Sequence, residues 1–142
     1  MTGRGVRAVG PAGGWARAEV VPAGDGPAGA DGLIRVLVGA GDPLDEAVLR
    51  SYVIGAVHMA AGMVCSEGLA VDEAGTVHDL TVRSFGVLSP SALPRVEVVF
   101  DPEGGEPVAV SDAVFAATAA AVWRSHGFPP RWPTGSSVLP IA

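Results

Sequence analysis

The chain has 142 residues, of which 49% are apolar, and a formal net charge of −6, so it is long enough for one ordinary domain with its own core. Its acidic balance, with nine scattered Arg and no Lys, argues against a basic nucleic-acid-binding surface. A single cysteine, Cys65, excludes an internal disulfide and a cysteine-cluster metal site.

The start of the chain has no apolar stretch of the kind that forms the centre of a signal peptide. The longest apolar run, Ser51 to Cys65, is shorter than the roughly 18 residues of a membrane-spanning helix and contains His58. Both observations favour a soluble, cytoplasmic protein. We expect Cys65 to be a buried small apolar side chain rather than a reactive thiol.

Residues 1–14 are rich in Gly, Pro and Arg and predict a flexible N-terminal arm, either disordered or laid along a partner. The alternation in WARAEVVP predicts a strand over 15–22, and the almost wholly apolar LIRVLVGA predicts a buried strand over 33–40. The composition of residues 23–32 indicates a loop between these strands.

A long helix is expected over about 43–66. Asp42 suits the helix cap, Pro43 suits the first helical position, and two acidic residues follow in the first turn. The middle of the helix, VIGAVHMAAGM, is apolar all round, which indicates burial on most sides. Its glycines would let another backbone approach closely.

The segment after this helix, GLAVDEAGTVHDLTVRSFGVL, predicts two strands joined by a tight turn at 72–75. A further strand is expected over 95–101, and a second helix over about 110–126 that Ser111 caps. The Pro-rich tail cannot form regular structure. The order ββαβββα predicts an α+β two-layer sandwich, in which a mixed sheet of four or five strands carries two helices on one face.

One loop has a composition suited to presenting a side chain. In DPEGGEP, two glycines allow a sharp turn and close approach to a ligand, and Glu106 follows them. Taken alone, the stretch also fits a charged turn in an acidic protein. We expect Arg131 and Trp132 of the tail to line the same cavity as Glu106.

The three histidines offer no metal site, because positions 58, 78 and 126 are far apart and lie in different elements. Each fits an imidazole that is either hydrogen-bonded within the protein or exposed to solvent. We expect His58, on the apolar helix, to contribute to stability rather than to catalysis.

Several stretches resemble, in the same order, the C-terminal part of the molybdopterin-binding large subunit of the xanthine dehydrogenase/aldehyde oxidase family. They are GAVHMAAGMVCSEGLAVDEAGTVHDLTVRSFGVLSPSALPRVEV, GGEPVAVSDAVFAATAAAVW and RWPTG, which are similar to the family's helix–hairpin–strand run, its "GxGEPP" loop with the following helix, and its short "L-P-A/T-T" segment. The resemblance divides the chain into an arm over 1–14, a molybdopterin-subunit-like domain over 15–135 and a tail over 136–142.

The resemblance implies an oxidoreductase with a catalytic glutamate. In the family, the glutamate of the "GxGE" loop lies next to molybdenum and is the general base that deprotonates a metal-bound hydroxyl. By motif match this residue is Glu106, and the preceding Gly104 and Gly105 would approach the cofactor. The resemblance implies no metal ligand on this chain.

The sequence also departs from the family. It is several times shorter than the family's subunit, Ser51 and Tyr52 stand where the family commonly has a Gly-Gln pair that contacts the pterin, and DPEGGE lacks the family's Lys. We therefore expect molybdopterin, where present, to be held mainly by a larger molybdopterin-subunit-like partner chain and not by this chain alone.

Three functions remain compatible with these residues. The chain is the small subunit of a split molybdenum-hydroxylase-like oxidoreductase and supplies Glu106 to a larger chain. Alternatively, it is a cofactor-free derivative that acts with a related partner on a small-molecule substrate in proton-transfer chemistry, such as isomerisation, cyclisation or elimination. A third alternative is a non-catalytic assembly subunit. The GGEP stretch favours the first two, and the missing Gly-Gln and Lys favour the last two.

Overall fold

The computed structural model describes residues 5–24, 32–78, 81–82 and 84–140. Their order is β1 (Val6–Val9), β2 (Trp15–Val21), β3 (Leu33–Gly39), α1 (Glu46–Cys65), a 3₁₀ turn η1 (Pro90–Ala92), β4 (Arg95–Phe100) and α2 (Ser111–Ser125). The α+β class with a mixed sheet and two helices, expected from the sequence, is confirmed.

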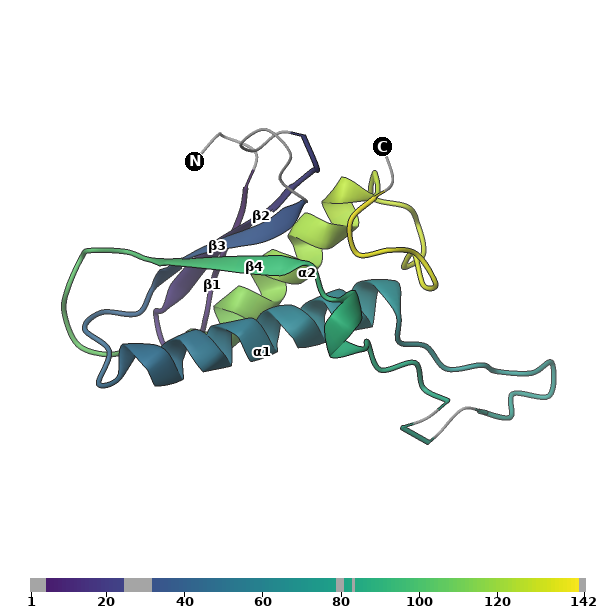
Figure 1. Cartoon of the computed structure of the whole chain (residues 1–142). Helices are drawn as coiled ribbons and strands as arrows, with labels where there is room; N and C mark the ends of the chain where they lie inside the picture. The colour runs from purple at the N-terminus through teal and green to yellow at the C-terminus, as the bar shows by residue number, and fades with distance from the viewer. Residues whose placement is uncertain (1–4, 25–31, 79–80, 83, 141–142) are drawn as a thin grey trace.

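The four strands form one sheet in the order β1-β2-β3-β4. The first two pairs are antiparallel hairpins, whereas β3 and β4 run parallel because α1 carries the chain back between them. One sheet face is apolar, as in the cross-strand row Ala18, Val36 and Val98, and belongs to the core that both helices share. The molecule is thus a two-layer sandwich with both helices on that face (Figure 1).

The expectation of an irregular N-terminal arm is wrong for Val6–Val9. This stretch is β1, and it pairs with β2 along its whole length. Its even positions, Val6 and Ala8, are half-buried against the core, so a short period-two pattern outweighs the Gly- and Pro-rich composition around it. Residues 1–4 of the expected arm lie outside the described residues.

The expected hairpin after α1 does not join the sheet. Its described residues hold a turn in which Gly75 N–H donates to the Asp72 carbonyl, and an isolated bridge between Val71 and Val77. The segment projects from the body as an arm (Figure 1). The alternating pattern predicted strands here, but no strand of the sheet lies beside this segment to pair with it. Positions 79–80 and 83 lie outside the described residues. The fourth strand of the sheet is β1 instead.

The helix caps differ from the expected ones. Asp45, not Asp42, caps α1, because its Oδ1 accepts the N–H groups of Ala47 and Val48 at 2.8 and 3.0 Å. Ser111 is the first residue of α2 rather than its cap, and the cap residue Val110 makes no side-chain hydrogen bond. Asp42 is left free for another contact.

Helix α1 is buried on one side only. Val53, Val57 and Val64 lie in the core, whereas Tyr52 is 65% exposed and Met59 is 56% exposed. The expectation that α1 is buried on most sides is therefore wrong within this chain. Among the described residues, α1 is the helix long and apolar enough to cross a membrane by length and composition. Its packing against α2 and the sheet is that of a core helix.

Candidate functional site

The loop that carries Glu106 lies beside the loop that leads into α1. Because β3 and β4 are parallel, both loops leave the same edge of the sheet. Two backbone hydrogen bonds join them: Asp101 N–H donates to the Val38 carbonyl at 2.8 Å, and Val108 N–H donates to the Ala40 carbonyl at 2.9 Å. The sheet topology alone therefore brings positions more than sixty residues apart in sequence into contact.

Asp42 holds the tip of the Glu106 loop. Its own N–H donates to the carbonyl of Gly105 at 2.9 Å, and its Oδ2 accepts the N–H of Gly105 at 3.1 Å. The packing at this point is close: a Cβ on Gly104 would lie 2.9 Å from Asp42 Oδ1, and a Cβ on Gly41 would overlap the carbonyl oxygen of Glu106.

A cleft of about 230 Å³ opens beside this loop. Its lining combines glycine backbone, the carboxylates of Asp101, Glu103 and Glu106, and one aromatic wall, Trp15. The Glu106 side chain is exposed at the cleft. A carboxylate that is accessible, on a main chain that is fixed, can accept a proton from a group that a partner or substrate brings to it.

The cleft does not suit molybdopterin as a ligand of this chain alone. The cofactor carries a phosphate, and a phosphate site normally provides cationic side chains or a helix N-terminus. The lining residues include three carboxylates and no Arg or Lys. Glu106 can therefore face a bound group from one side, but the described residues of this cleft do not provide a cradle for the pterin.

The three histidines have separate structural partners. His58 Nε2 lies 2.8 Å from the Leu88 carbonyl, His78 Nε2 lies 3.0 Å from Asp72 Oδ2, and His126 lies beside Cys65. Among the described residues, no group of His, Cys, Asp and Glu could hold a metal ion.

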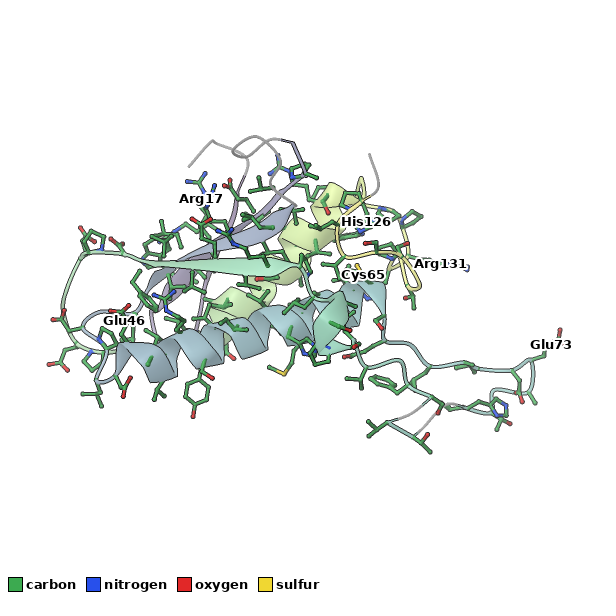
Figure 2. All side chains as sticks on the ribbon, in the orientation of Figure 1. Arg17, Glu46, Cys65, Glu73, His126 and Arg131 are labelled. Carbon is green, nitrogen blue, oxygen red and sulfur yellow. The ribbon has the colours of Figure 1, made fainter. Side chains whose placement is uncertain are left out.

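Cys65 is buried, as expected, and its burial raises the pKa of its thiol to about 11. It lies at the end of α1 together with His126 (Figure 2). A thiol with so high a pKa is a poor nucleophile near neutral pH.

Arg131 and Trp132 do not line the Glu106 cleft, so this expectation is wrong. The tail is joined to the C-terminal end of α1, where Gly135 N–H donates to the Cys65 carbonyl. The Glu106 loop is joined to the other end, and twenty helical residues separate the two by about 30 Å. Figure 2 shows Arg131 at one end and Glu46 at the other.

An apolar groove of about 360 Å³ adjoins the Glu106 loop and was not predicted from the sequence. It is lined by Ala40, Pro43, Leu44, Asp45, Val48, Leu49, Tyr52, Pro107 and Val108. Val48, Tyr52, Gly55 and Met59 continue from it as one exposed stripe, which we call the outer face of α1. The helical spacing of these four positions was visible in the sequence, but their exposure was not.

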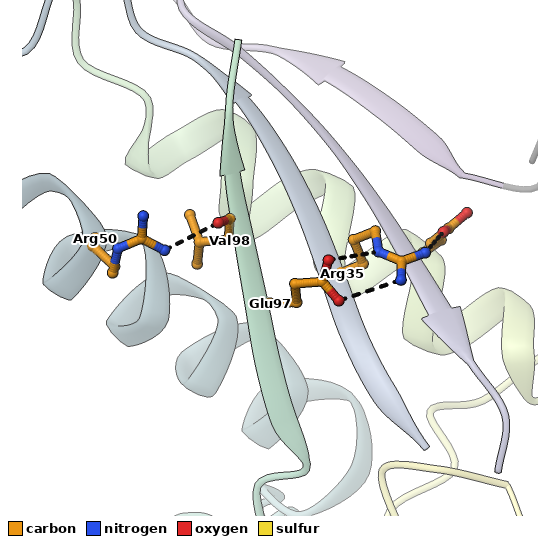
Figure 3. A network of polar contacts seen from close by, with 5 residues as sticks. Arg35, Arg50, Glu97 and Val98 are labelled. Atoms are coloured by element: carbon orange, nitrogen blue, oxygen red, sulfur yellow. Dashed lines mark hydrogen bonds and ion pairs between the residues drawn. The ribbon is translucent and has the colours of Figure 1, made fainter. Parts of the chain in front are cut away.

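The opposite face of the sheet carries a charged row instead. Arg35 donates to Glu19 at 3.0 Å and to Glu97 at 3.2 Å (Figure 3). The hydrogen bond with Glu97 is the main reason that the pKa of Arg35 is raised. Glu19 is only 4% exposed, and its Oε2 atom has no hydrogen-bond partner in the part of the chain that the structure describes. This row lies away from the loops that form the Glu106 cleft.

No family model matches the chain, and no curated protein matches it. Solved structures do match. The Cu,Mo-CO dehydrogenase in its carbon monoxide reduced state gives a TM-score of 0.58 at 16% identity, over 81% of this chain and 16% of that chain. Quinoline 2-oxidoreductase from Pseudomonas putida 86 gives a TM-score of 0.57 at 16% identity, over 77% of this chain and 14% of that chain. The reconstituted CO dehydrogenase from Oligotropha carboxidovorans gives a TM-score of 0.58 at 16% identity, over 81% of this chain and 16% of that chain.

The likeness is one of fold, and it is confined to a small part of those proteins. This chain spans 14–16% of the length of the matched chains. The fold that the sequence resemblance implied is therefore confirmed. The chain has the fold of one domain within the much longer chains of CO dehydrogenase and quinoline 2-oxidoreductase.

Proposed function

We propose that this chain is the small subunit of a split molybdenum-hydroxylase-like oxidoreductase, docks on a larger chain and supplies Glu106 to the shared active site. The observation that carries the proposal is the placement of Glu106. It is exposed on a glycine loop that Asp42 holds, at the position matching the catalytic glutamate of the family that the sequence resembles.

Glu106 would act as a proton acceptor. Its side chain makes no hydrogen bond within the described residues, whereas Asp42 fixes the loop that precedes it. The carboxylate is therefore free to turn towards a small-molecule substrate or an activated nucleophile at the contact with the larger chain. A positioned general base of this kind contributes about 10²–10⁴-fold to a rate.

The larger chain would cover the outer face of α1 and the adjoining groove. Val48 is 51% exposed, Tyr52 65% and Met59 56%, and Gly55 leaves the helix backbone open between them. The arm after α1 adds Leu69, Val71 and Val82, all exposed. Apolar surface gathered in this way marks an interaction site. The matched dehydrogenase chain is about five times as long as this one, which supports a larger chain as the occupant.

Any molybdopterin would then be held mainly by the larger chain, because the lining of the Glu106 cleft is acidic. When bound, that group would supply the redox chemistry, and this chain would supply the carboxylate. The cytoplasmic placement expected from the sequence is part of the same proposal.

The acidic lining also favours a second candidate, in which the complex has no molybdenum cofactor and uses Glu106 for proton transfer alone. Purification of the chain together with the larger chain, followed by metal analysis and an activity assay, separates the two. Stoichiometric molybdenum supports the first function. A metal-free complex with isomerase, cyclase or lyase activity supports the second.

Glu106→Gln tests the role that both candidates share. We expect activity of the complex to fall about 10²–10⁴-fold, because the amide cannot accept the proton, while assembly and molybdenum content stay unchanged. Glu103→Gln is the matched control, since it removes the same charge from the same exposed loop, and we expect it to stay near full activity. Full activity in Glu106→Gln would leave only the assembly role.

A further inference from the structure

We infer that Asp42 and Gly41 form a latch that fixes the main chain of the Glu106 loop before any partner binds. The latch consists of two reciprocal hydrogen bonds between Asp42 and Gly105, at 2.9 and 3.1 Å. One uses the backbone of Asp42 and the other uses its carboxylate. A single residue therefore holds both backbone polar groups of Gly105, its N–H and its carbonyl, and it does so across 63 positions of sequence.

Close packing supports the latch independently of the hydrogen bonds. Gly41 has a φ of +67°, a conformation that glycine adopts readily, and any Cβ there would overlap the Glu106 carbonyl oxygen. A Cβ on Gly104 would lie 2.9 Å from Asp42 Oδ1. A Cβ on Gly41 would thus overlap backbone, whereas a Cβ on Gly104 would displace the Asp42 carboxylate.

The loop needs a restraint because it contains two adjacent glycines. Gly104 and Gly105 have more backbone freedom than any other residue pair, and ordering one residue costs about 1–2 kcal/mol of conformational entropy. Without a restraint, Glu106 would sample many positions. The hydrogen bonds of Asp42 restrict that sampling in the free chain, so a partner meets a carboxylate whose main chain is already placed.

Asp42 can bind Gly105 because a different aspartate caps α1. Two aspartates precede α1, and Asp45 alone satisfies its first N–H groups. Asp42 makes no cap bond to the helix and turns its carboxylate to Gly105 instead. Its role is therefore that of a positioning residue, because it acts through the loop and not on the reacting atoms.

Limited proteolysis of the free chain tests the latch without any assay of activity. An endoprotease that cleaves after glutamate can cut the Glu103–Gly104 bond only when the loop opens, and the cleavage rate tracks the open population when opening is fast. We expect Asp42→Ala to raise this rate about five- to tenfold, the effect of losing one hydrogen bond to a charged group at an exposed site. Asp42→Asn keeps an acceptor oxygen, so its rate of cleavage after Glu103 should lie between the rates of Asp42→Ala and the unchanged chain. Cleavage after Glu73, on the arm, is the internal reference.

Gly41→Ala and Gly75→Ala provide a matched pair. Both glycines have positive φ, +67° and +82°, but nothing lies within 4 Å of a Cβ on Gly75. We expect only Gly41→Ala to speed cleavage after Glu103. The latch is overturned when Asp42→Ala and Asp42→Asn both leave that rate unchanged in a folded chain. If the alanine variant does not fold, Asp42→Asn decides alone.

The consequence for catalysis rests on the proposed function and can fail separately. In the complex, Asp42→Ala should lower the activity less than Glu106→Gln does, and Asp42→Asn should restore part of it. Full activity of Glu106→Gln would overturn the proposed function, yet the proteolysis result on the free chain would still decide whether the latch exists.

Discussion

At the scale of single residues, polar side chains in this protein mostly tie distant segments together. His58 connects α1 to the segment before η1 through the Leu88 carbonyl, and Asp42 connects two loops across the sheet edge. Thr118 Oγ1 is an exception, since it is buried without a hydrogen-bond partner among the described residues. The residues that hold the fold are therefore distinct from the one carboxylate proposed for chemistry.

His58→Ala should destabilise the chain without altering the Glu106 loop. The substitution removes a hydrogen bond to the Leu88 carbonyl and leaves that half-buried segment less well held, which costs about 1–2 kcal/mol of unfolding free energy. Urea denaturation measures this loss. His78→Ala, at an exposed position, is the control and should change the unfolding midpoint little. An unchanged midpoint in His58→Ala would show that the bond contributes nothing.

At the scale of elements, the arm after α1 depends on one aspartate for its turn. Asp72 Oδ1 accepts the N–H groups of Ala74 and Thr76, and its Oδ2 meets His78. The hydrogen bond with His78, followed by that with Thr76, keeps the pKa of Asp72 below its ordinary value. The turn is thus stabilised by the ionised form of an exposed side chain.

The turn should open in acid. Because the folded pKa of Asp72 is lowered, its contribution is fully present above the ordinary aspartate pKa of about 3.9. It is lost as the pH falls through the lowered value. We expect the backbone N–H signals of Ala74 and Thr76 in NMR spectra to move towards random-coil positions in that range, and Asp72→Asn to weaken the same contacts at neutral pH. Signals that stay unchanged down to acid pH would contradict this account.

The elements also differ in how far the sequence determines them. β3, β4 and α2 carry strong apolar patterns and form where expected. β1 has only four residues between glycine-rich flanks, and its strand pairing depends on β2. The arm shows the reverse case, since its alternation predicts strands but the fold gives it no sheet neighbour. The role of Glu106 stays a prediction from the motif. The contact of Asp42 with its loop could not be predicted, because two nearby aspartates suit a helix cap equally well.

At the scale of the whole molecule, polar and apolar surfaces are segregated. The open sheet face carries the Glu19–Arg35–Glu97 row, whereas the outer face of α1 is apolar and the arm adds exposed Leu69, Val71 and Val82. The apolar side adjoins the Glu106 loop through Pro107 and Val108. A chain docked on that side would therefore lie next to the proposed base.

Tyr52→Glu should prevent docking of the larger chain while the fold is kept. The side chain is 65% exposed on the outer face of α1, so a charge there meets water in the free chain but would be buried in the proposed complex. Val9→Glu is the control, at a 59% exposed position on the opposite sheet face. Light scattering and co-purification measure the outcome. Docking that survives Tyr52→Glu would place the interface elsewhere.

Arg50 protects the free border of the sheet. It reaches from α1 to donate to the Val98 carbonyl at 3.0 Å (Figure 3). Its guanidinium also lies 4.9 Å from the centre of the Phe100 ring. β4 ends the sheet on this side, and an unpaired border strand is where a foreign strand can attach and start aggregation. Such an invading strand would first have to displace Arg50 from both contacts. The contacts of Arg50 therefore occupy part of the border at which a foreign strand would attach.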